Sequence, residues 1–353
     1  MTPTDTQALN NLDRQAANKA RVLAELDRFP FRPPLRLRNP HLQTCYARAF
    51  RKNPPIERRV EMWDTPDGDL LQVFILDGDP DKPTLLMLHG LEGHGESNYV
   101  LGINELLKVH RWNVITLVHR SCGGVMNRAK RMYHSGASED LDFAVSRLVA
   151  ERPDIELYLH GVSLGGNVVG KWLGQNGDGV PSNIKAAAIV SAPYDLLASG
   201  PHMDTGVRRL YVRYFLKSLI PKAIEKERQY PGCVDIEAVK NSKTFREFDT
   251  HATAALHGFR DSEDYYAKVS CGQYLPGICR PILLLSAHDD PFNPGHTLPH
   301  TAAAASPWLH PQFPKYGGHV GFVMKGPGGK TVFWAEEQSV RFFLEYDRIR
   351  SIS

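Results

Sequence analysis

The chain lacks the features that mark several large classes of protein. It has only five cysteines in 353 residues, none of them in C-x-x-C spacing, which argues against a disulfide framework. No apolar run approaches the ~18 residues of a membrane span, and the polar first thirty residues contain no apolar signal-peptide core. We therefore expect a soluble, cytoplasmic protein.

Motifs for metal and nucleotide binding are also missing. There is no H-E-x-x-H pattern, so no metal is predicted. The glycine-rich stretch at 161–166 lacks both the Gly-Lys-Ser/Thr of a phosphate loop and G-x-G-x-x-G spacing, so no cofactor is expected. The net charge is only +3, from 42 Lys and Arg against 39 Asp and Glu, which indicates no nucleic-acid partner.

One segment departs from this charge balance. Between Phe31 and Arg59 there are eight Lys and Arg residues against Glu57 alone. We interpret it as a solvated or internally paired surface, with contact to a lipid or membrane surface left open. No obligatory protein partner is indicated.

The pattern of apolar residues predicts the fold class. Short, nearly all-apolar runs at 84–90, 113–118, 155–161 and 184–193 alternate with helix-length segments such as 138–151. Strands that are apolar on both faces need helices on both faces, which predicts an α/β protein with a mostly parallel, doubly wound sheet. A hairpin is expected at 56–76 and a closing helix at 331–349.

The alternation is interrupted once. From Asp195 to about Phe259 the sequence is typical of helices of mixed basic and aromatic character. We therefore predict a single domain over residues 1–353, with an N-terminal helical extension at 1–55 and a helical cap inserted at about 195–260.

Ser163 lies in the stretch Gly161-Val162-Ser163-Leu164-Gly165, where a predicted strand passes directly into a predicted helix. Such a G-x-S-x-G turn exposes the serine hydroxyl on a strained backbone, and its small residues let strand and helix approach each other. The context favours a catalytic nucleophile over a structural glycine-serine turn.

A serine nucleophile needs a base and an acid, and the downstream sequence offers both. His319 follows two glycines after the last predicted strand, and Asp289 and Asp290 follow the strand at 281–287. The order Ser, Asp, His is that of α/β-hydrolases. Adjacent side chains point in different directions, so at most one of the two aspartates can face His319.

Two backbone amides are candidates for binding the oxyanion. The segment His89-Gly90-Leu91-Glu92-Gly93 follows a predicted strand, and its glycines permit a path that aims an N–H at the site. We predict that the N–H groups of Leu91 and Leu164 act together, with an ordinary strand-to-helix loop as the alternative.

Eight motifs in order resemble the YheT-like α/β-hydrolase family, which is related to fungal medium-chain ethyl ester synthase/esterases and ABHD lipases. They are NPHLQT, HGLEG, YHSG, GVSLGGN, EFDTHATAALHGF, DYY, DDPF and GGHVGF. The resemblance covers roughly Pro33 to the C-terminus and implies an α/β-hydrolase fold and carboxylic-ester hydrolysis without a cofactor. It also implies a triad of Ser163, Asp290 and His319. One departure is Ser121, which stands where relatives usually carry the glycine of Arg-Gly-Cys.

The expected function is therefore a serine carboxylic-ester hydrolase that acts on a small-molecule acyl ester. Apolar residues in the predicted cap favour short- to medium-chain acyl groups. An acyltransferase would use the same triad with an alcohol as acceptor, and a non-catalytic binding protein of the same fold is a third hypothesis. Covalent labelling of Ser163 distinguishes the enzymes from the binding protein.

Overall fold

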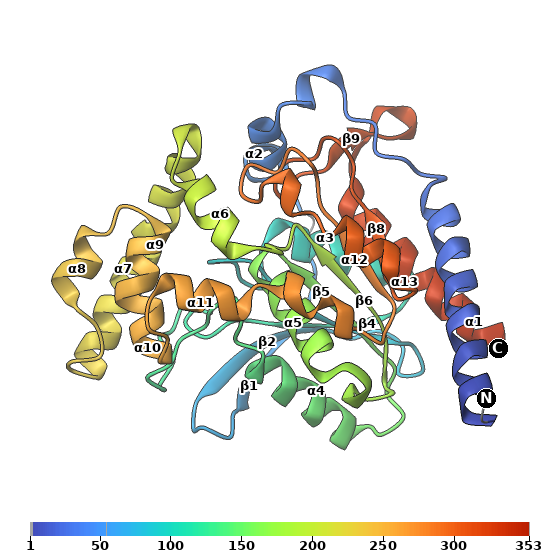
Figure 1. Cartoon of the computed structure of the whole chain (residues 1–353), viewed down its shortest axis with the longest axis horizontal. Coiled ribbons are helices and arrows are strands. Elements are labelled where there is room, and N and C mark those ends of the chain that lie inside the picture. Colours follow the sequence, from blue (N-terminus) through green and yellow to red (C-terminus); the bar gives the residue numbers. More distant parts are fainter. Residues whose placement is uncertain (1–2, 54, 353) are drawn as a thin grey trace.

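The computed structural model describes residues 3–53 and 55–352, so the predicted extension at 1–55 includes residues 1–2 and 54, which lie outside the described part. Its centre is a sheet of eight strands in the order β1-β2-β4-β3-β5-β6-β7-β8 (Figure 1). These are Arg59–Asp64 (β1), Leu70–Leu76 (β2), Thr84–Leu88 (β3), Asn113–Leu117 (β4), Leu157–Val162 (β5), Ile184–Val190 (β6), Ile282–Leu285 (β7) and Leu309–Gln312 (β8).

The strand directions confirm the predicted fold class. β2 pairs antiparallel with both β1 and β4, and every other neighbouring pair is parallel. The predicted hairpin is thus β1 and β2. The carboxyl ends of the parallel strands meet at one edge of the sheet, which is where ligands bind in open α/β folds.

Helices cover both faces of the sheet, as the apolar strands require. Leu85 and Met87 of β3 pack with α1 (Pro3–Leu26), α3 (Asn98–Val109) and α13 (Trp334–Ile352). Leu86 and Leu88 point to the other face, toward α4 (Glu139–Glu151), α5 (Leu164–Asn176) and α12 (His300–Ala305). The alternation of side chains along one strand therefore builds two separate cores.

The segment between β6 and β7 is helical. It contains α6 (Leu196–Met203), α7 (Arg209–Gln229), α8 (Ile236–Asn241), α9 (Phe245–Phe248), the π-helix η4 (Asp249–Ala254), α10 (Ala255–His257) and α11 (Ser262–Val269). Asp195 and Asp235 start α6 and α8 by accepting backbone N–H bonds from three residues further on. α6 to α10 share a small apolar core with Met132, beside the sheet at the left of Figure 1.

One prediction is wrong at its boundary. Residues 331–333, expected to open the closing helix, form β10 (Thr331–Phe333), which pairs antiparallel with β9 (Val323–Lys325). The β-branched and aromatic side chains of β10 favour a strand, and the Pro-Gly-Gly turn before it closes the hairpin. The helix α13 therefore begins at Trp334.

The Arg120 side chain is fully buried and joins the β1–β2 hairpin turn to α4. It donates hydrogen bonds to Asp67 (3.0 Å), Asp69 (2.7 Å) and Asp140 (2.7 Å). Burial alone would raise the pKa of Asp69, but the Asn127 amide and nearby backbone N–H groups lower it to about 2. The cluster is thus a charged structural core.

Ser121 adopts φ +64°, a conformation that favours glycine. Its hydroxyl lies 2.6 Å from Asn127 Oδ1 and 3.0 Å from the sulfur of Met126. These contacts hold the serine in the left-handed region, so the loop keeps the conformation that glycine would adopt.

Replacement of Arg120 by Met is expected to lower the free energy of unfolding by about 3–5 kcal/mol, because it leaves buried carboxylates without their cation. Urea denaturation at neutral pH measures this. Arg131→Met is the matched control, since Arg131 pairs with the same Asp67 and Asp140 but is partly exposed. Its loss should stay below about 1 kcal/mol, and equal losses would contradict the assignment of Arg120 as the buried centre.

Candidate active site

Ser163 lies at the sharp turn between β5 and α5, with φ +53° and ψ −118°. Two flanking glycines permit this turn. A Cβ atom at Gly161 would lie 2.4 Å from the carbonyl oxygen of Gly165, and one at Gly165 would lie 2.5 Å from that of Leu88. The backbones of β5, α5 and β3 therefore approach so closely at this turn that only glycine fits at these two positions.

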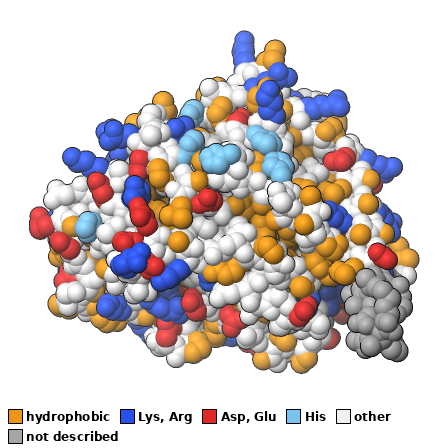
Figure 2. Space-filling model, viewed as in Figure 1, with side chains coloured by type: hydrophobic (Ala, Val, Ile, Leu, Met, Phe, Trp, Pro, Cys, Tyr) orange, Lys and Arg blue, Asp and Glu red, His pale blue; other side chains and the backbone are white. Residues whose placement is uncertain are grey.

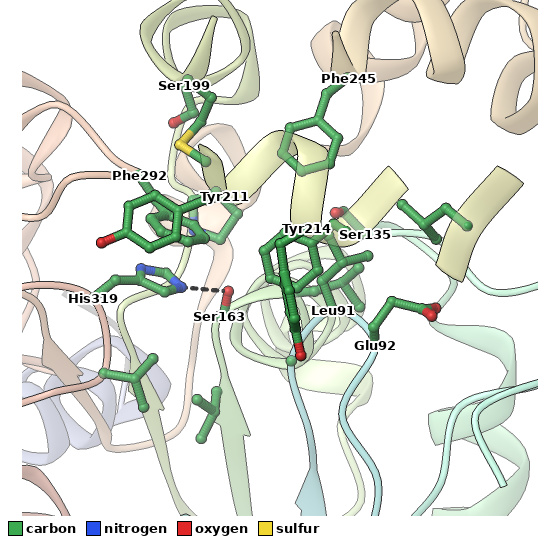
Figure 3. A pocket seen from close by; sticks show the side chains of 18 of the residues that line it. Leu91, Glu92, Ser135, Ser163, Ser199, Tyr211, Tyr214, Phe245, Phe292 and His319 are labelled. Carbon is green, nitrogen blue, oxygen red and sulfur yellow. Dashed lines mark hydrogen bonds between the residues drawn. The ribbon is translucent and has the colours of Figure 1, made fainter. Parts of the chain in front are cut away.

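The structure brings His319 and Asp290 to this serine. His319 Nε2 lies 2.8 Å from Ser163 Oγ, and His319 Nδ1 lies 2.9 Å from Asp290 Oδ2 (Figure 3). Asp290 is buried and also accepts the backbone N–H of Phe292 at 2.7 Å. The three predicted side chains thus form one hydrogen-bonded row that ends at the hydroxyl.

Asp289, unlike Asp290, does not bond the His319 ring but the backbone of the loop before it. Its Oδ1 accepts the backbone N–H of Gly318 at 2.9 Å, while its Oδ2 is buried with no partner in the described part of the chain. Burial raises the pKa of Asp289 to about 6, and the neighbouring Asp290 adds to the rise. Asp289 therefore supports the loop that carries His319.

Other contacts that hold His319 were missed by sequence reasoning. The ring of Phe292 stacks on the imidazole, with centroids 4.1 Å apart and planes 3° apart. Thr44 Oγ1 accepts the backbone N–H of His319 at 2.9 Å, and its neighbour Gln43 bonds both backbone groups of Val323. Thr44 and Gln43 belong to the motif NPHLQT on α2 (Pro40–Phe50), so that motif holds the histidine loop in place.

The predicted oxyanion loop runs beside the serine. A Cβ at Gly90 would lie 3.2 Å from Ser163 Cβ, so the backbone passes directly next to the hydroxyl. The N–H groups of Gly90 and Glu92 donate to Tyr99 and Tyr133, whereas that of Leu91 has no acceptor among the described residues. The Leu164 N–H opens α5, where helical N–H groups have no partner within the helix.

His89 holds this loop through both ring nitrogens. Burial lowers the pKa of His89 well below its usual value, so the ring is neutral. His89 Nε2 accepts the backbone N–H of His119 at 3.0 Å, so its Nδ1 carries the proton and donates to the Gly90 carbonyl at 2.8 Å. The loop is thereby tied to the neighbouring strand end.

A charged contact joins the same loop to the helical insertion. Glu92, at φ +53°, pairs with Lys222 of α7 at 2.7 Å and accepts the hydroxyl of Tyr133 at 2.6 Å. Cys122 lies against both charged groups, and burial raises the pKa of its thiol to about 12. Cys122 is therefore a protonated, structural thiol.

A cavity of about 960 Å³ opens at Ser163. Its polar side is formed by Ser163, His319 and the loop at 90–92, and its apolar side by residues of the helical insertion, of which Tyr211, Tyr214 and Phe245 are visible in Figure 3. His41 and His134 also line it. The site is therefore a serine and histidine at the polar end of a large apolar pocket.

These features define a hydrolase, and the family comparison agrees: residues 83–323 match the model of the α/β hydrolase fold, and the chain belongs to that family. Within it, the chain is 35% identical over 321 residues to YheT of Escherichia coli (strain K12), which is provisionally named an esterase. That match covers 89% of this chain and 92% of YheT, and confirms the resemblance to YheT-like proteins.

More distant relatives are also hydrolases of esters by name. The phospholipase ABHD3 of Mus musculus is 28% identical over 80% of this chain and 70% of its own. A medium-chain fatty acid ethyl ester synthase/esterase of Saccharomyces cerevisiae is 26% identical over 76% of this chain and 63% of its own. The predicted enzyme class, a carboxylic ester hydrolase, is thus confirmed.

Solved structures support the fold. The Pyrococcus furiosus esterase Pf2001 superposes with a TM-score of 0.54 at 16% identity, covering 85% of this chain and 97% of that one.

Among the described residues, no helix is both long enough and apolar enough to cross a membrane.

Asp290→Asn is expected to lower kcat for ester hydrolysis by roughly 10⁴-fold, because the imidazole loses the carboxylate that sets its tautomer. Asp289→Asn is the matched control. An Asn there keeps the acceptor for Gly318 and removes a buried charge, so a loss of about tenfold or less is expected. Steady-state rates on an activated ester, with circular dichroism to establish folding, measure both, and the reverse ranking would overturn the assignment.

Proposed function

We propose that this chain is a serine carboxylic-ester hydrolase that uses Ser163, His319 and Asp290 as its catalytic triad. The observation that carries the proposal is the distance of 2.8 Å between His319 Nε2 and a serine hydroxyl on a strained turn. A serine in an ordinary glycine-rich loop needs neither the strained backbone nor a base within hydrogen-bond distance.

In the proposed acylation, Ser163 Oγ attacks the carbonyl carbon of the ester while His319 Nε2 accepts its proton. Asp290 holds the opposite ring nitrogen in its protonated form and stabilises the imidazolium. The N–H groups of Leu91 and Leu164 bind the developing oxyanion, and the positive end of the α5 dipole adds to its stabilisation. The leaving alcohol then takes the proton from His319.

Deacylation repeats these steps with water as the nucleophile, returning the acyl group as a carboxylic acid and the proton to Ser163. An alcohol in place of water would give a new ester by the same route. That alternative is favoured by the name of the yeast relative, an ethyl ester synthase/esterase. Both reactions would use the same triad and oxyanion amides. We propose hydrolysis first because water is the acceptor at the highest concentration.

The helices between β6 and β7 act in this proposal as a cap that holds the acyl chain. Apolar residues from α6, α7, α9 and α10 line the cavity: Met203, Leu210, Phe215, Leu219, Phe245, Phe248 and Leu256. A cavity of about 960 Å³ has to receive both the acyl chain and the alcohol part of the ester. We therefore assign short- to medium-chain acyl esters as substrates.

The wild-type chain is expected to react covalently with a fluorophosphonate probe, because such probes label an activated serine. Ser163→Ala should lose all labelling, as read by gel fluorescence and by the mass of the intact protein. Ser199→Ala is the control, since Ser199 lines the same cavity but its hydroxyl bonds Asn293 and the backbone of Asp195. If the folded wild-type chain neither reacts with the probe nor cleaves an activated ester, the proposed serine hydrolase function is excluded.

A series of p-nitrophenyl esters tests the acyl chain length. The value of kcat/KM should be highest for acyl chains between butanoyl and dodecanoyl and should fall for hexadecanoyl, because the enclosed apolar volume is shared with the alcohol part. Rates that climb steadily to hexadecanoyl would contradict the assignment while leaving the triad untouched.

A further inference from the structure

Two segments far apart in the chain carry positive charge without any negative charge. Residues 32–52 and 205–222 contain eleven Lys and Arg and no Asp or Glu, although the net charge of the whole chain is only +3. Two of these cations are neutralised, since Arg51 pairs with Glu336 and Lys222 with Glu92. Within the described residues the other nine form no salt bridge: Arg32, Arg36, Arg38, Arg48, Lys52, Arg208, Arg209, Arg213 and Lys217.

The fold brings the two segments together at the active-site cavity. His41 Nδ1 on α2 lies 3.1 Å from the hydroxyl of Tyr211 on α7, and the Arg48 guanidinium lies 5.0 Å from the ring centre of Tyr214. All four of these side chains line the cavity. The segments 32–52 and 205–222, here called the basic rim, therefore border the entrance of the cavity together.

The basic rim also exposes large apolar side chains, which soluble surfaces normally keep scattered. Leu35 and Phe50 are 76% and 71% exposed, and Leu42, Val207, Leu210 and Tyr214 are between 49% and 59% exposed. Four of these six line the cavity: Leu42, Val207, Leu210 and Tyr214. Figure 2 shows Lys and Arg side chains with hydrophobic ones between them along the upper edge of the molecule, where Figure 1 places α2.

We propose that the basic rim docks this enzyme on an anionic lipid surface, with the entrance of the active-site cavity facing the lipid. Arginines attract the acidic headgroups, and the apolar side chains between them insert at the boundary with the acyl chains. An acidic protein partner would also match the charge, and failure of the chain to bind acidic vesicles would favour it over lipid. The mixture of both kinds of side chain around one apolar opening favours lipid.

This inference rests on the proposed function, because it describes how an amphiphilic ester reaches Ser163. An ester held in the lipid layer would enter the cavity past Leu42, Leu210 and Tyr214 without crossing water. The docking itself needs no catalysis, so the two proposals can fail separately.

Sedimentation with vesicles tests the docking directly. The full chain should bind vesicles of equal parts phosphatidylglycerol and phosphatidylcholine, and should bind pure phosphatidylcholine vesicles at least about tenfold more weakly. Raising the salt concentration from about 0.1 M to 1 M should release the protein, since screening shortens the reach of the arginines. Equal and salt-independent binding to both vesicles, or no binding to either, would overturn the proposal.

Two double variants separate the charged and the apolar contributions. Arg209→Glu/Arg213→Glu and Leu35→Ser/Phe50→Ser should each weaken binding to the acidic vesicles by about tenfold or more. The controls are Lys82→Glu/Lys108→Glu, which changes the net charge equally, and Val109→Ser/Ile352→Ser, which removes two apolar side chains that are 78% and 72% exposed. None of the four control residues lines the cavity, and controls that lose binding as strongly as the rim variants would overturn the assigned surface.

Activity distinguishes this inference from the proposed function. None of the four rim residues changed here lines the cavity, so both rim variants should hydrolyse soluble p-nitrophenyl butanoate at the wild-type rate and lose rate only on an ester presented in acidic vesicles. Ser163→Ala should bind the vesicles like the wild type. Vesicle binding without turnover of any ester would refute only the proposed esterase function. Turnover of soluble ester without vesicle binding would refute only the proposed docking.

Discussion

The strained backbone of Ser163 is the constraint on which the other features of the site depend. A side chain at φ +53° is held there only because β5 and α5 meet at two glycines that no larger residue can replace. That turn also places the first N–H of α5 beside the hydroxyl and brings the loop after β3 against it. One local strain therefore sets the relative positions of the hydroxyl and of both amides proposed to bind the oxyanion.

The histidine must meet that fixed hydroxyl, and it is held from several directions. Asp290 bonds its ring from the end of β7, Phe292 stacks on the ring, and Thr44 on α2 bonds its backbone. Asp289 bonds the preceding glycine. Because these contacts come from the loop after β7 and from α2, the loop that carries His319 is held from two parts of the chain and cannot shift without breaking at least one of them. Such support is what keeps a catalytic group within hydrogen-bond distance of its partner.

The helical insertion connects the chemistry to the outer surface. Lys222 ties α7 to Glu92 on the loop beside the serine, while the first turns of the same helix carry the basic and apolar residues at the cavity entrance. A single helix therefore contacts the loop proposed to bind the oxyanion, lines the cavity at Ser163 and forms part of the basic rim. Movement of this helix would therefore affect all three.

The sequence by itself determined the fold class, the turn at Ser163 and the order of the candidate triad, because periodicity and glycine spacing are local properties of the chain. It misjudged residues 331–333, where pairing with β9 outweighs the helical pattern. Only the tertiary structure decided that Thr44 bonds His319, 275 positions away, and that Phe292 covers its ring. It likewise decided that two separate basic segments border one cavity. Contacts of this kind depend on how distant elements pack, and no local pattern of residues encodes them.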